Sequence, residues 1–195
     1  MVLAPPTLTL EQFLTQPETK PAQEYIEGAI SPKPMPQGRH SRLQAKLCAA
    51  INQAAETEAI AAAFPELRCT CGDIAPQGQA QRSLVPDIAV FRWARIPFTA
   101  EGDVCDRFSL APDWTIEILS TDQSPNRVIG NILYLMRHGT ELGWFIDPED
   151  RSILVFTSQQ EPELFTGAMA LPCLPDIPLS LTATQVFRWL QMAKG

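Results

Sequence analysis

Apolar residues recur at helical spacing in two segments of the chain, residues 38–59 and 127–139. The apolar positions are Leu43, Leu47, Ile51 and Ala54 in the first segment, and Val128, Ile132, Leu135 and Met136 in the second. This spacing predicts one amphipathic helix in each segment. Two short helices are predicted near the ends, because Thr9 and Thr182 are each followed three residues later by Gln, the capping-box pattern.

Short apolar runs bounded by Pro and Gly predict strands between these helices. The runs occupy residues 24–34, 66–76, 83–93, 106–120, 142–158 and 162–167. In residues 142–158 we expect two antiparallel strands joined by the turn-rich "DPED". The order of helices and strands predicts an α+β (mixed α/β) fold with one central sheet. The length of 195 residues, without repeats or linkers, favours a single domain over residues 1–195.

Composition and charge narrow the function classes. The net charge of −7 argues against a surface coated with basic residues for nucleic acid. It leaves a nuclease open, because a carboxylate-rich metal site adds negative charge of its own. The five cysteines include one close pair, Cys69 and Cys71, and are expected to be reduced thiols rather than zinc ligands. Without a signal peptide or a long apolar run, the chain is expected to be cytoplasmic and not bound to a membrane.

Two acids stand in apolar strands and are the first candidates for chemistry. Asp87 begins the run that follows Pro86, and Glu117 lies between Ile116 and Ile118. Burying a carboxylate is costly unless it is paired, protonated or bound to a metal. Two such acids on neighbouring strands would suit Mg²⁺, although each acid could instead point to solvent.

Several motifs, in order, resemble a known family of nucleases. These are "EYIEG", "RHSRLQAKL", "VPDIAVF", "WTIEILS" and "GWFIDP", spread over residues 10–160. The set resembles the Uma-type restriction endonucleases of the PD-(D/E)xK nuclease superfamily. The resemblance implies a restriction endonuclease-like core, with a mixed sheet flanked by helices. It also implies cleavage of DNA with a divalent metal, Mg²⁺ or Mn²⁺.

The resemblance assigns roles to individual residues. Asp87 and Glu117 match the metal-binding acids, and the carbonyl of Ile118 would be a third ligand. Glu27 would be an accessory acid near the site, and His40 would lie toward the same cleft. The alternatives stay open: Glu27 can be an ordinary acid in a turn, and His40 can begin its helix in full contact with solvent.

The expected lysine is the point at which this chain departs from the superfamily. Its usual position, two residues after the second acid, is Leu119, and the matching place in the following helix is Arg127. Arginine cannot act as a base, but it can stabilise a charged transition state. An ion pair with Asp122 would explain Arg127 without catalysis, and Lys46 is a conceivable substitute for the lysine.

These observations favour a Mg²⁺-dependent DNA endonuclease that acts as a homodimer, since two copies most simply cut two strands. A first alternative is a nuclease fold without turnover that serves as a DNA-binding or regulatory partner. A second is a structural or oligomerisation protein with no role on nucleic acid, which the negative charge supports.

Overall fold

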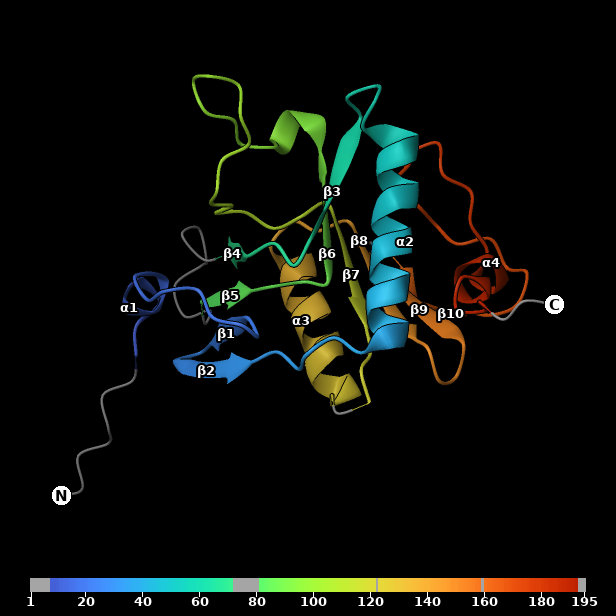
Figure 1. The fold of residues 1–195 in the computed structure, drawn as a ribbon, viewed down its shortest axis with the longest axis horizontal. Coiled ribbons are helices and arrows are strands. Elements are labelled where there is room, and N and C mark those ends of the chain that lie inside the picture. The colour runs from blue at the N-terminus through green and yellow to red at the C-terminus, as the bar shows by residue number, and fades with distance from the viewer. Residues whose placement is uncertain (1–7, 72–80, 122, 159, 193–195) are drawn as a thin grey trace.

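A six-stranded mixed sheet forms the centre of the molecule (Figure 1). The structure is a computed structural model that describes residues 8–71, 81–121, 123–158 and 160–192. The strand order is β10-β9-β8-β7-β6-β3, with β7 and β8 parallel and the other neighbours antiparallel. The strands are β3 (Ala61–Pro65), β6 (Ile88–Arg92), β7 (Trp114–Ile118), β8 (Leu142–Asp147), β9 (Ser152–Thr157) and β10 (Gln160–Phe165). The predicted α+β fold with a mixed central sheet is confirmed, as is the pair of strands joined by "DPED".

A second, antiparallel sheet of four strands was not predicted. Its order is β2-β1-β5-β4. The strands are β1 (Gln23–Ile26), β2 (Ala29–Pro32), β4 (Cys69–Cys71) and β5 (Arg82–Leu84). The run 83–93, expected to be one strand, is divided at Val85–Asp87, where Pro86 has no N–H to donate to a ladder. As a result β5 belongs to the small sheet and β6 to the large one.

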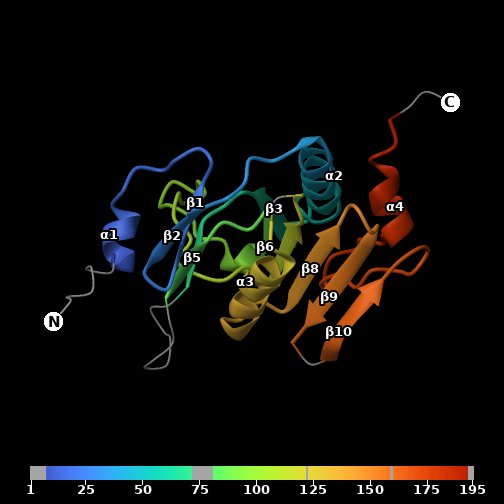
Figure 2. The same ribbon diagram turned by 90° about the horizontal axis from the view of Figure 1, so that it is seen from below.

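The two predicted amphipathic helices cover opposite faces of the large sheet (Figure 2). Helix α2 (Gly38–Ala55) packs Leu43 and its other buried residues against the face that contains Trp144. Helix α3 (Pro125–Arg137) packs Ile132 against Phe145 on the other face. Successive side chains of a strand point to opposite faces of its sheet, so the adjacent residues Trp144 and Phe145 of β8 pack in different hydrophobic cores.

Local signals at the chain ends behave as expected. Helix α1 (Leu10–Leu14) and helix α4 (Ala183–Arg188) each begin with the predicted capping box, formed by a Thr and a Gln. A single 3₁₀ turn, η1 (Trp93–Arg95), follows β6. No helix in the described part of the chain is long and apolar enough to cross a membrane.

The β1–β2 hairpin brings two polar side chains toward the large sheet. Its two-residue loop has positive φ at both positions, 53° at Glu27 and 88° at Gly28, as a type I′ turn requires. Directly after β2, the N–H of Lys33 donates to the carbonyl of Ala22 across the hairpin (2.8 Å). Lys33 therefore lies beside Glu24, which is buried in β1.

Candidate active site

Asp87 and Glu117 lie opposite each other where the two sheets meet. Residues Ile88 and Ile116 are partners in the antiparallel β6–β7 ladder, and continuing this register by one residue pairs Asp87 with Glu117. Both side chains are buried, with 2% and 4% exposure. The structure thus brings the two predicted acids together, and neither points into solvent.

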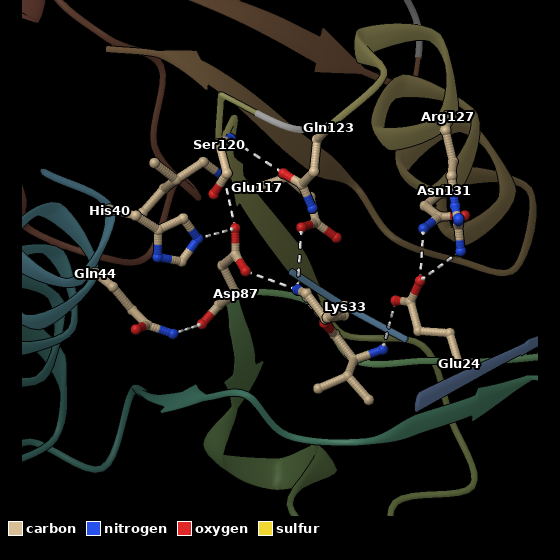
Figure 3. Close-up of polar contacts among 12 residues, drawn as sticks. Glu24, Lys33, His40, Gln44, Asp87, Glu117, Ser120, Gln123, Arg127 and Asn131 are labelled. Atoms are coloured by element: carbon tan, nitrogen blue, oxygen red, sulfur yellow. Dashed lines mark hydrogen bonds and ion pairs between the residues drawn. The ribbon is translucent and has the colours of Figure 1, made fainter. Parts of the chain in front are cut away.

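A lysine that the sequence analysis did not identify lies between these acids (Figure 3). Lys33 Nζ donates to Asp87 Oδ1 (2.6 Å) and to the carbonyl of Val85 (2.6 Å). It lies 3.7 Å from Glu117 Oε2, and its side chain is 12% exposed. The cation that faces the predicted metal-binding acids is therefore Lys33, which follows a strand of the small sheet.

Asp87 is held in place by three further groups (Figure 3). Its Oδ2 accepts from the N–H of Ile118 (2.7 Å) and lies 2.9 Å from His40 Nε2. Its backbone carbonyl accepts from Gln44 Nε2 (2.8 Å). His40 is buried and lies within the cluster, so it is not the solvated start of a helix.

The buried charges shift the pKa values of all three central groups. Burial alone would raise the pKa of Asp87, but Lys33 and His40 outweigh it and hold that pKa below its usual range. Burial alone would lower the pKa of Lys33, but the acids around it, Glu117 first, raise it instead. Burial raises the pKa of Glu117 well above its usual value, and Asp87 adds to the rise although Lys33 opposes it. The same set of buried charges thus lowers the pKa of Asp87 and raises the pKa values of Lys33 and Glu117.

A third buried acid, Glu24, connects the cluster to α3. Glu24 Oε1 accepts from the N–H of Val85 (3.1 Å), and Oε2 accepts from Asn131 Nδ2 (3.4 Å). Arg127 lies 3.7 Å from Glu24 Oε2. Arg127 therefore pairs with Glu24 rather than with Glu117, although both acids line the same cavity of about 300 Å³. Asp122, the other suggested partner of Arg127, lies outside the described residues.

Glu27 is not brought to this cluster. It occupies the hairpin turn, where its Oε1 accepts from Arg82 (2.6 Å) and its side chain is half-exposed. In the motif "EYIEG", the acid that reaches the site is the first, Glu24, because it lies within β1 rather than in the turn. Lys46 is half-buried on α2. Among the described lysines, Lys33 is the one that contacts Asp87 and Glu117.

The residues of the cluster fit a small divalent cation. Within residues 8–71, 81–121, 123–158 and 160–192, no group of three or more His, Cys, Asp or Glu side chains is arranged to hold a metal. Glu117 Oε1, however, is buried and has no hydrogen-bond partner among the described residues. The N–H of Ile118 points at Asp87, and in an extended strand its carbonyl points to the same side. Two carboxylates and one carbonyl, completed by water, form the kind of oxygen set that Mg²⁺ accepts.

Two comparisons identify proteins similar to this chain. The model of the Uma2 family, described as "Putative restriction endonuclease", matches residues 10–185. A crystal structure of "a putative nuclease belonging to DUF820" from Anabaena variabilis is 47% identical in sequence, with a TM-score of 0.88. The similarity covers 94% of this chain and 99% of that one. A search of curated proteins found no match.

Proposed function

We propose that this chain, which belongs to the Uma2 family, is a divalent-metal-dependent endonuclease that hydrolyses phosphodiester bonds in DNA. The observation that carries this proposal is the position of Lys33, whose ammonium group lies between Asp87 and Glu117. The absence of a lysine at position 119 motivates the alternative of a fold without turnover, and the ammonium group of Lys33 beside both acids argues against that alternative. The site then has the acids and the cation that the reaction requires.

Asp87, Glu117 and the carbonyl of Ile118 would hold the metal ion, Mg²⁺ or Mn²⁺. When bound, such an ion polarises the phosphate and lowers the pKa of a coordinated water. A bound metal ion would favour the ionised form of Glu117, because its positive charge opposes the rise in pKa that burial causes. The unpartnered Oε1 of Glu117 is the atom most available for this role.

Lys33 acts in this proposal as a fixed positive charge. Its raised pKa keeps the ammonium protonated, so it serves to stabilise charge and to orient water rather than to accept a proton. Two of its three donors are already directed by Asp87 and Val85, which fixes where the third can point. A group preorganised in this way stabilises the extra negative charge that develops on the phosphate.

Other residues hold these groups in position. His40 and the N–H of Ile118 fix the carboxylate of Asp87, and Gln44 fixes its backbone. Arg127 pairs with Glu24, but its side chain is 45% exposed, so part of the guanidinium is free to bind a phosphate next to the scissile one. Arg127 is thus proposed to bind substrate rather than to replace the lysine.

The proposal is tested by relaxation and linearisation of supercoiled plasmid with Mg²⁺ or Mn²⁺. Asp87→Asn keeps the size of the side chain, and we expect it to lower the cleavage rate by at least about 100-fold. Asp103→Asn changes an exposed acid between η1 and β7, outside the cluster, and is the matched control, with an unchanged rate. Wild-type protein without activity, or Asp87→Asn with full activity, would contradict the proposal. Light scattering of the same samples tests whether the active species is a homodimer.

A further inference from the structure

An exposed methionine lies beside the proposed catalytic cluster, in a proline-rich segment. Met35 is 64% exposed and is placed between Pro34 and Pro36, two residues after Lys33. It lines a cavity of about 450 Å³ that also contains Lys33, His40 and Asp87. Proline restricts its own φ and the conformation of the residue before it. Pro36 therefore restricts the backbone of Met35, whose large apolar side chain lines the cavity.

The cavity is lined by both apolar and polar residues. Pro21, Ala22, Val85 and Met35 contribute apolar surface, while Asp87 is at the catalytic end. The volume falls in the range of roughly 300–1,000 Å³ that is usual for sites that enclose small molecules. A single nucleoside is a ligand of this size class, with a flat aromatic base and a polar sugar. The apolar lining residues match the base, and the polar ones match the sugar and phosphate.

Charge does not account for binding at this cavity. Three cations and four acids line the cavity. Lys33 is paired with Asp87, and Arg68 donates twice to the carboxylate of Glu18 (2.8 and 2.7 Å). The exposed Lys20 is outweighed by the remaining acids, Glu66 and Asp106. The chain as a whole carries a net charge of −7. Binding to duplex DNA without base contacts depends on neutralising many phosphates with Lys and Arg. Affinity here must therefore come largely from apolar contact, which requires a base whose face is not covered by its neighbours.

We infer that the 450 Å³ cavity receives one unpaired nucleobase next to the scissile phosphate, with Met35 packed against it, and that the preferred substrate is single-stranded or locally unpaired DNA. The inference rests on the proposed endonuclease function. Unpairing a base from a duplex is costly, and the cost is least where the base is already mismatched or single-stranded. Contact between a methionine and an aromatic ring, and insertion of Met at base steps, are both established modes of recognition.

The test compares labelled oligonucleotides of one sequence in three forms: single strand, perfect duplex, and duplex with a central mismatched bubble. We expect wild-type protein to cleave the single strand and the bubble faster than the duplex. Met35→Ala should lower kcat/KM on the bubble by roughly two- to tenfold, the range that sulfur–aromatic contacts support, with a smaller effect on the duplex. Met169→Ala removes a methionine that is 40% exposed elsewhere and should change nothing. A duplex cleaved as fast as the bubble, or a bubble-to-duplex ratio that Met35→Ala leaves unchanged, would overturn the inference.

Binding without added metal separates this inference from the proposed function. Fluorescence anisotropy should show tighter binding of the bubble than of the duplex, with the difference reduced in Met35→Ala. If the wild-type protein shows this preference but cleaves nothing, the hydrolytic function fails while the assignment of the cavity stands. Cleavage without any preference overturns the assignment and leaves the endonuclease intact. If the wild-type protein shows neither cleavage nor preferential binding, both the proposed function and the assignment of the cavity are overturned.

Discussion

Replacing Lys33 by methionine removes the positive charge at the centre of the site while keeping a side chain of similar length. Lys33 and Asp87 have side chains that are 12% and 2% exposed, so their ion pair is nearly free of solvent. Removing one partner of such a buried pair costs about 3–5 kcal/mol of folding free energy. The loss should be near the lower end of this range, because Asp87 keeps its hydrogen bonds to Ile118 and His40. Urea unfolding of the metal-free protein measures it.

The effect of Lys33→Met on catalysis should be larger than its effect on folding. Loss of one preorganised charge-stabilising group typically lowers kcat by about 10²–10³-fold. The assay is single-turnover cleavage of a labelled oligonucleotide with saturating Mg²⁺. Lys20→Met is the matched control, since Lys20 is an exposed lysine that lines the same 450 Å³ cavity. We expect Lys20→Met to lower kcat less than about threefold, the effect of losing one phosphate contact.

Two results would refute the role given to Lys33. One is a folded Lys33→Met protein, as judged by circular dichroism, that cleaves at the wild-type rate. The other is an equal loss in Lys33→Met and Lys20→Met, which would make the contribution of Lys33 a general effect of charge. If Lys33→Met does not fold, Lys33→Gln answers the same question, because its amide can donate to Asp87 or Val85 without a charge.

Three further predictions concern the residues around Lys33. Glu24→Gln should lower the cleavage rate at least about tenfold, since removing a buried group that orients an active site commonly lowers activity by that factor. Glu27→Gln, in the hairpin turn, should leave the rate unchanged in the same assay. His40→Ala should weaken Mn²⁺ binding by about 10–100-fold in calorimetry, because His40 orients Asp87 from outside the ligand set, and unchanged affinity would contradict this. The pKa of Glu117 is raised in the folded protein, so we expect metal binding to release a proton from it and the apparent metal affinity to fall as the pH falls. Titrations in buffers of different ionisation enthalpy measure the released proton. Glu117→Gln should abolish this proton release.

The parts of the fold that could be predicted from the sequence are those with local causes. The amphipathic spacing of α2 and α3 and the two capping boxes involve residues at most a few positions apart. The second sheet had no comparable local signal. The run from Ser83 to Trp93 is apolar on both sides of Pro86, and its division between two sheets depends on which strands pair with each half.

The candidate site divides in the same way. Asp87 and Glu117 could be recognised because an acid inside an apolar strand demands a buried partner. Lys33 could not, because it is 54 positions from Asp87 and 84 positions from Glu117 (117 − 33). Glu27 was the acid assigned from the motif "EYIEGAI", and Glu24 was missed. Which of the two reaches the cluster depends on where the hairpin turns, and this can be predicted only if the two-residue loop is recognised.

The division of the chain at Val85–Asp87 explains why the lysine can come from an unexpected place. The carbonyl of Val85 accepts from Lys33, and its N–H donates to Glu24, so both side chains of the β1–β2 hairpin are attached to the segment that carries Asp87. The electrostatic task requires only a positive charge within a few ångströms of Asp87 and Glu117, and it does not matter which strand supplies it. A search for lysine at a fixed offset from Glu117 finds Leu119 and suggests an impaired enzyme, whereas the packing of the small sheet on this segment supplies the ammonium from Lys33. The integrity of the active site therefore depends on the contact between the two sheets.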